Sequence, residues 1–313
     1  MITTSTLLAP VAISGSRRLV MSWSRIIRLL LAASLLTLLN GCSAIKLAYN
    51  NLPEVGYWWV DGYVDLNEVQ SLRLRADLAR LQEWHRRNEL PRIADLLQQV
   101  QRLATADTTP EQVCSLYADI RKRLDAVATQ AEPGALALAM RLTPEQRKHL
   151  QARFDKGNKE WRRDRISAGR AEREDKRLKA ELDRAEDFYG TLGEPQRKLL
   201  QQAIAASSFD PQRLYAERVR RQQDMLAMLR EIAPGDGVPA VDAAQGVAAV
   251  RGYVERTTRS PDPLYRSQAE TAVQENCQTY ARLHNSTTPE QRARAVTRLA
   301  AYERDARELA AQR

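Results

Sequence analysis

The chain has 313 residues and a net charge of +9, with 28% charged and 6% aromatic residues. This length suffices for one large helical domain or two smaller ones. The charge would suit nucleic-acid binding, but residues 1–41 hold four arginines and no acidic residue, so the chain without them carries only +5. That modest charge, together with an export signal, argues against a nucleic-acid partner.

Residues 1–41 are predicted to be an export signal, for which Met21 is an alternative initiator to Met1. Two arginines precede an apolar run at 29–39, which is typical of a signal peptide and too short to span a membrane. Cys42 follows, so the stretch resembles a bacterial lipoprotein signal in which Cys42 receives lipid and becomes the mature N-terminus. The alternative is a plain secretory signal before an ordinary cysteine. By analogy with bacterial lipoprotein sorting, the absence of Asp after Cys42 indicates the outer membrane, facing the periplasm.

Residues 42–64 are predicted to form a lipid-anchored aromatic segment. Its aromatic residues are Tyr49, Tyr57, Trp58, Trp59 and Tyr63. One interpretation places these rings at the headgroup level of the membrane, as an interfacial belt. The other places them in the core of the helical domain, which we favour because the chain has few other large side chains to fill a core.

Residues 65–313 are predicted to form the helical domain. Ala, Leu, Arg, Glu and Gln dominate and β-branched runs are few, which indicates an all-α fold, an elongated multi-helix bundle with one long charged helix or helical hairpin. Asp65 and Glu68 are predicted to form the capping box of the first helix, and Pro133-Gly134 to end the third. Helices are expected at about 65–88, 91–103, 109–132, 144–190, 192–207, 211–232, 240–257, 264–284 and 289–312.

The stretch from Arg141 to Arg184 holds 15 basic and 9 acidic residues. Its middle has almost no apolar residue, so we expect the helix to project from the body. One interpretation is a solvated face laced with i,i+4 ion pairs; the other is a surface that binds anionic lipid headgroups or acidic proteins. The residues of this possible interaction surface are Arg162, Arg163, Arg165, Arg170, Arg173, Lys176 and Arg177.

Two cysteines, Cys114 and Cys277, remain in addition to Cys42. In an exported bacterial protein they are predicted to form a disulfide that joins an early helix to a late one. The alternative is two small buried side chains that never meet.

The tetrapeptide Thr-Pro-Glu-Gln occurs at 109–112, 143–146 and 288–291, with a weaker version at 193–196. Thr as N-cap, Pro at the first helical position and Gln at N3 explain it as a helix start without any function. The intervals are unequal, so no fixed-period repeat is indicated. With Leu142 before it, the second copy also resembles the LTxxQ motif of the Spy/CpxP periplasmic chaperone and stress-adaptor family, which is helical and client-binding.

A wider resemblance lies in CSA and LAYNN at the start of the mature chain, in YWWVDGY at 57–63, and in WHRR and ELP at 84–87 and 89–91. These residues are similar to a family of bacterial lipoproteins known only as a domain of unknown function. The resemblance implies a helical envelope lipoprotein and carries no active site.

The three histidines, His85, His149 and His284, are isolated, and no metal-binding, nucleophile or phosphate-loop motif occurs. We therefore predict no catalytic residue, metal or cofactor. The sequence favours an interaction or structural protein, held at the membrane by its lipid, that binds an envelope protein or anionic surface. The alternatives are a chaperone-like protein for unfolded clients and, third, an enzyme without a recognisable motif. The oligomeric state is left open.

Overall fold

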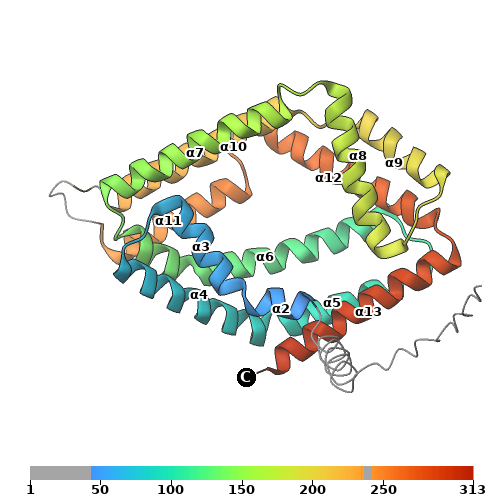
Figure 1. The fold of residues 1–313 in the computed structure, drawn as a ribbon, viewed down its shortest axis with the longest axis horizontal. Helices are drawn as coiled ribbons and strands as arrows, with labels where there is room; N and C mark the ends of the chain where they lie inside the picture. Colours follow the sequence, from blue (N-terminus) through green and yellow to red (C-terminus); the bar gives the residue numbers. More distant parts are fainter. Residues whose placement is uncertain (1–43, 234, 236–240, 313) are drawn as a thin grey trace, which may run out of the picture. The chain divides into compact units, whose positions relative to one another are not determined.

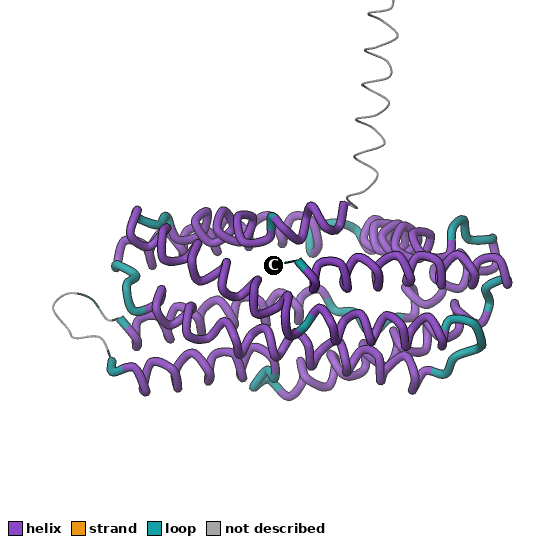
Figure 2. Tube along the Cα trace, turned by 90° about the horizontal axis from the view of Figure 1, so that it is seen from below, coloured by secondary structure: helices purple, strands orange, loops and turns teal. Residues whose placement is uncertain are grey.

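The computed structural model describes residues 44–233, 235 and 241–312, which form α-helices and no strand (Figures 1 and 2). The predicted all-α class is therefore confirmed. The export signal at 1–41 and the lipidation of Cys42 lie outside the described residues. The helices are α2 (Ala44–Asn50), α3 (Leu52–Val64), α4 (Glu68–Asn88), α5 (Leu90–Leu103), α6 (Pro110–Ala139), α7 (Pro144–Arg165), α8 (Arg170–Tyr189), α9 (Glu194–Ala206), α10 (Pro211–Ile232), α11 (Ala243–Thr258), α12 (Pro263–Asn285) and α13 (Pro289–Ala311). Within this part of the chain, no helix combines the length and apolar character that crossing a membrane requires.

The helix starts follow the capping chemistry that the sequence indicates. In α7 and α13, the Thr143 and Thr288 hydroxyls accept from the backbone N–H of the Gln three positions on, and that Gln side chain accepts from the Thr N–H. The predicted cap of α4 is wrong: Asn67 caps it with Gln70, two residues later than expected. Asp65 instead ends α3 in the left-handed conformation, at φ 59°.

Two further boundaries differ from the sequence prediction. Helix α6 runs through Pro133 to Ala139, since the apolar residues after the proline, Leu136 among them, are buried in the core. The long charged stretch divides at Ile166–Gly169 into α7 and α8. It does not project from the body, because α7 packs on α3 and α10 while α8 packs on α9 and α13.

By internal contacts the chain divides after Leu47, and the unit from Ala48 onward contains the end of α2 and all the later helices. The helices of this unit repeat one packing order in two halves, the first from α3 to α7 (residues 52–165) and the second from α8 to α13 (residues 170–311). In the first half α3 packs on α4 and α7, and α4 packs on α6; in the second, α8 packs on α9 and α13, and α9 packs on α12. The halves also pack on each other. Helix α13 of the second half packs on α5 of the first, α7 of the first packs on α10 of the second, and α6 packs on α12. Figure 1 shows α6 crossing the middle of the unit.

Each half is held at its end by a reciprocal pair of glutamine amides. In the first half Gln70 and Gln146 exchange Nε2–H···Oε1 hydrogen bonds of 3.0 and 2.6 Å. In the second, Gln196 and Gln291 exchange bonds of 2.8 and 3.2 Å. Each Nε2 also donates to a backbone carbonyl five residues before its partner glutamine. The same bonds at the same offsets show that the two halves are structurally equivalent.

The halves are also joined covalently. Cys114 of α6 and Cys277 of α12 form the predicted disulfide, with sulfur atoms 2.06 Å apart and Cα atoms 5.5 Å apart. Cys277 is buried. Because α6 and α12 are the equivalent helices of the two halves, the disulfide lies on the contact that relates them.

Candidate functional site

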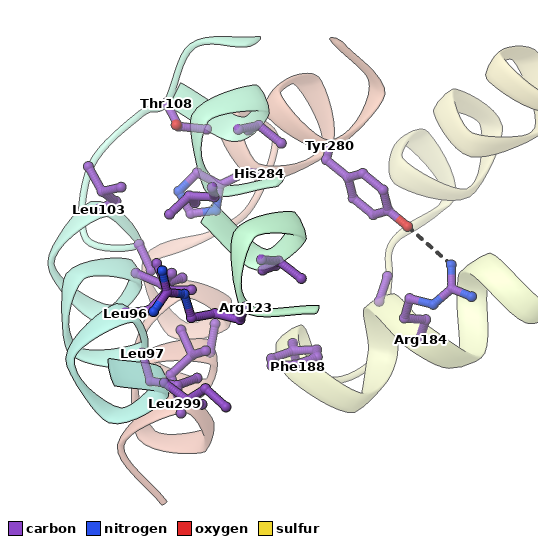
Figure 3. A pocket seen from close by; sticks show the side chains of 18 of the residues that line it. Leu96, Leu97, Leu103, Thr108, Arg123, Arg184, Phe188, Tyr280, His284 and Leu299 are labelled. Atoms are coloured by element: carbon purple, nitrogen blue, oxygen red, sulfur yellow. Dashed lines mark hydrogen bonds between the residues drawn. The ribbon is translucent and has the colours of Figure 1, made fainter. Parts of the chain in front are cut away.

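A cavity of about 590 Å³ with a largely apolar wall lies against α8, α12 and α13 of the second half (Figure 3). Helices α5, α6, α8, α12 and α13 enclose it. Its wall is built from aliphatic side chains such as Leu96, Leu97, Leu283 and Leu299, with Phe188 from α8. The volume lies within the range of roughly 300–1,000 Å³ that small-molecule sites occupy.

One wall of the cavity is the apolar stripe of α6. Its members recur at helical spacing, and Leu116, Ile120, Leu124 and Val127 all line the cavity. The side chains of Ile120 and Leu124 are nevertheless 50% and 58% exposed. The stripe is therefore only partly covered by the described helices, which leaves apolar surface in contact with water.

The charged groups of the wall are all basic. Arg123 reaches across to Glu89 with an N–O distance of 3.4 Å, and Arg92 contacts the other oxygen of that carboxylate at 2.9 Å. Glu89 is fully buried, and a buried charge requires partners. On another side Arg184 donates to Tyr280 Oη at 3.2 Å, the bond drawn in Figure 3, and pairs with Glu181. None of the described lining residues is Asp or Glu.

The side chains of His284 and Tyr189 form a hydrogen-bonded pair in the wall of the cavity. His284 Nε2 lies 2.8 Å from the Ala106 carbonyl oxygen, so it carries the proton and donates, and Nδ1 accepts from Tyr189 Oη at 2.9 Å. Burial lowers the pKa of His284 and raises the pKa of Tyr189 to about 12. Both groups are therefore neutral near pH 7 and serve as structural hydrogen-bonding groups.

A second, smaller cavity of about 420 Å³ lies at the equivalent place in the first half. Leu150 and Phe154 of α7 line it, and the same positions relative to the paired glutamine, Ala295 and Leu299 of α13, line the larger one. Tyr63 lines the smaller cavity, with its ring 6.0 Å from that of Phe154. Both halves thus form an interior space, and the space in the second half is the larger.

The aromatic segment is divided between core and surface. Tyr49 and Tyr57 are buried against α4, where Tyr49 Oη lies 3.0 Å from His85 Nδ1 and Tyr57 Oη donates to Ser71 Oγ at 3.3 Å. Trp58 and Trp59 point outward and are 60% and 66% exposed. On one helix neighbouring residues cannot share a face. The core interpretation therefore holds for Tyr49 and Tyr57, Tyr63 is half-buried, and the interfacial belt stays a prediction for Trp58 and Trp59.

The predicted basic surface is engaged largely with its own neighbours. Arg170 pairs with Glu174 and Lys176 with Glu172, both at 2.7 Å and one turn apart. The remaining members are each tied to an adjacent group. Arg163 pairs with Asp164, Arg173 donates to Ile166 and Ala168, Arg177 donates to Ser207 and lies over Phe209, Arg162 lies over Tyr215, and Arg165 lies over Trp161. These contacts are those of a solvated face and of the α7–α8 junction.

The histidines and possible metal ligands among the described residues do not come together as a site. No group of three or more His, Cys, Asp or Glu within this part of the chain could hold a metal ion. His85 and His284 are each hydrogen-bonded within the core, and His149 is exposed. The site is thus an apolar binding cavity with basic side chains in its wall.

Sequence reasoning missed this cavity and the glutamine pairs. The α6 stripe is visible in the sequence as apolar residues at helical spacing, but nothing in that spacing tells whether another helix covers it. The glutamines were recognised as capping residues, and their second role requires that two helix starts meet. Gln112, in the same motif, is exposed and bonds only within its own helix start.

Fold and site together define an all-helical protein with an apolar interior binding cavity. The chain belongs to DUF6279, a family of unknown function whose model matches residues 62–237. No curated protein matches the chain, and no solved structure matches it. The match supports the resemblance to a family of unknown function; lipoprotein character and similarity to Spy/CpxP stay predictions.

Proposed function

We propose that this protein is an interaction protein of the bacterial envelope, held by lipid on Cys42 at the periplasmic face of the outer membrane. The observation that carries the proposal is the division of the aromatic segment. Tyr49 and Tyr57 fix it to α4, while Trp58 and Trp59 project from α3 into solvent, close in sequence to the lipid site. Trp side chains at such a position favour the membrane interface. The helical domain would then lie close to the membrane.

The anchor is tested by labelling cells with a radioactive fatty acid. The wild-type protein should take up label and fractionate with the outer membrane, whereas Cys42→Ser should be unlabelled and released from it. A wild-type protein that is unlabelled and soluble would contradict the proposal.

The aromatic surface is tested with the protein lacking residues 1–42, mixed with anionic phospholipid vesicles. Replacing Trp58 and Trp59 by Ala should reduce vesicle binding about tenfold or more, because two large interfacial side chains are lost. Leu264→Ala is the matched control, since Leu264 is 64% exposed on a different helix. Equal loss in the control would show that the aromatic face has no special role.

A chaperone-like function is the second candidate, favoured by the half-exposed apolar residues Tyr117, Ile120 and Leu124 on α6. It predicts that the purified protein suppresses aggregation of an unfolded substrate. It also predicts that Ile120→Glu reduces this effect while Leu264→Glu does not. No suppression at stoichiometric excess would remove this candidate. Crosslinking in intact cells would then identify the partners of the anchored protein.

A further inference from the structure

We propose that the larger cavity binds one long-chain fatty acid, with its alkyl chain along α6 and its carboxylate at Arg123. Every residue that carries this proposal belongs to the unit from Ala48 onward, so the proposal does not depend on the lipid anchor. The proposal rests on the shape of the apolar wall, its exposure to water and the charge beside it.

The wall has the dimensions of an extended chain rather than of a compact ligand. From Leu116 to Val127 the lining residues of α6 extend over about 16 Å at the helical rise of 1.5 Å per residue. Helix α5 provides an opposing row that includes Leu96, Leu97 and Val100. A single alkyl chain is the ligand that contacts two such rows along their whole length.

The exposed apolar side chains supply the driving force. Ile120 and Leu124 are at least half exposed although both line the cavity. An alkyl chain that covers them removes apolar surface from water on both sides of the contact. Affinity should therefore rise with each methylene that the cavity accommodates.

The charge beside the cavity specifies the end group. Glu89 lies between two guanidinium groups, Arg92 at 2.9 Å and Arg123 at 3.4 Å, so these three side chains together carry one net positive charge. Asp95 and Asp119 line a neighbouring polar groove with both arginines, but the cavity wall itself has no carboxylate. Arg123 is the member that lines the cavity, and Figure 3 shows it beside Leu96 and Leu97. Arg184 differs, because Glu181 already balances it. A ligand carboxylate at Arg123 would balance the cluster and form a charge-assisted hydrogen bond.

The equivalent cavity of the first half is the internal reference. There Phe154 stands where the second half has the smaller Leu299, while Tyr63 and Tyr189 are equivalent tyrosines, and the volume is about 420 Å³ rather than about 590 Å³. The same helix arrangement thus encloses a larger space in the second half. The larger space, with Arg123 in its wall, is the site.

Binding is measured by isothermal titration of the protein lacking residues 1–42 with laurate, myristate and palmitate below their micelle concentrations. The affinity should rise by up to about fourfold per added methylene. Leu124→Glu, which places a carboxylate in the wall, should weaken palmitate at least tenfold, whereas Leu264→Glu, equally exposed outside the cavity, should leave it unchanged. Absence of binding, or equal losses in both variants, would overturn the site.

The carboxylate position is tested by comparing palmitate with hexadecanol. Wild-type protein should prefer palmitate about tenfold, a charge-assisted hydrogen bond being the difference. Arg123→Gln should lose this preference, and Arg184→Gln should keep it. Since Arg123→Gln could disturb Glu89, its melting curve is compared first, and the wild-type ratio tests the end group without any substitution. Equal wild-type affinities for both ligands, or equal binding of lysophosphatidylcholine, would overturn the assignment.

Discussion

In the first half of the helical unit, Phe154 lies eight residues after Gln146 and contacts Tyr63; in the second, the equivalent positions hold Leu299 and Tyr189. The first interior space, with the Phe154 ring in its wall, has a volume of about 420 Å³, whereas the second, with the aliphatic Leu299, has a volume of about 590 Å³. The glutamine pair at the end of each half is nevertheless the same. The two halves thus share the polar junction that joins their helix starts, while the neighbouring apolar residues differ and leave interior spaces of different volume.

The disulfide that joins the halves should have the largest effect on stability. Replacing Cys114 and Cys277 together by Ser opens a loop of 163 residues, which should lower the free energy of unfolding by about 5 kcal/mol in the chain-entropy model. Urea unfolding of the oxidised wild type and the double variant measures this difference. If hydrogen exchange shows that only one half of the double variant loses stability, the two halves are less coupled than the contacts between them indicate.

Acid should act next, through Glu217 of α10. Burial alone would raise the pKa of this carboxyl, but hydrogen bonds from Arg220, Arg221 and Ser260 outweigh it and lower the pKa from 4.5 to about 2. A carboxyl with a depressed folded pKa contributes stability that is complete above pH 4.5 and is lost as pH falls towards 2. The contribution is about 3 kcal/mol.

The measurement is the free energy of unfolding in urea between pH 6 and pH 2, for wild type and Glu217→Gln. At pH 6 the variant should have a lower free energy of unfolding than the wild type, and this free energy should fall less between pH 6 and pH 2. Because Glu217 contacts the α11–α12 loop rather than the cavity wall, the second half should hold its ligand down to the onset of unfolding. Parallel pH curves for the two proteins would contradict the role of Glu217.

The glutamine pairs allow the equivalence of the halves to be tested directly. Gln146→Ala and Gln291→Ala should each destabilise by about 2 kcal/mol, because each leaves a buried or half-buried partner amide without its hydrogen bonds. Gln112→Ala is the matched control from the same motif and should cost about 0.5 kcal/mol, since it loses only a cap contact. Thermal unfolding compares the three variants. A loss of stability in Gln291→Ala that is as small as in Gln112→Ala would contradict the equivalence of the two halves.

Exchanging the residues that distinguish the two interiors should give the smallest effects, with opposite signs. Phe154→Leu should destabilise the first half by about 1 kcal/mol through lost packing. Leu299→Phe should be neutral or stabilising by up to about 1 kcal/mol, because the added ring enters space that is already open. It should also weaken palmitate binding. A clear loss of stability in Leu299→Phe would show that the cavity is tighter than described.

The sequence predicts most of the fold because helix starts are local. Thr-Pro-Glu-Gln and Asp-Pro motifs position α7, α10 and α13 through contacts within four residues. It fails at two boundaries. Asn67 caps α4 in place of Asp65, which ends α3 and whose carbonyl accepts from Gln146 of α7. Helix α6 continues past Pro133 because Leu136 is buried in the core.

The candidate site was predicted only in fragments. The α6 stripe, the aromatic segment and the cysteine pair are visible in the sequence, whereas the cavity depends on helices far apart along the chain. Ile93 of α5 and Leu299 of α13 are more than 200 residues apart, yet both line it. No sequence pattern distinguishes Arg123 from the other arginines, because its importance depends on Glu89 and on a cavity wall built from other helices.

Hydrogen–deuterium exchange with and without palmitate tests most directly the claim that the larger interior space, and not its smaller equivalent, binds the ligand. We predict that palmitate slows exchange in α5 and in the part of α6 around Ile120 and Leu124. Exchange in α10 and α11, beside the smaller cavity, should stay unchanged. Slower exchange confined to α10 and α11, or no change anywhere, would contradict the account.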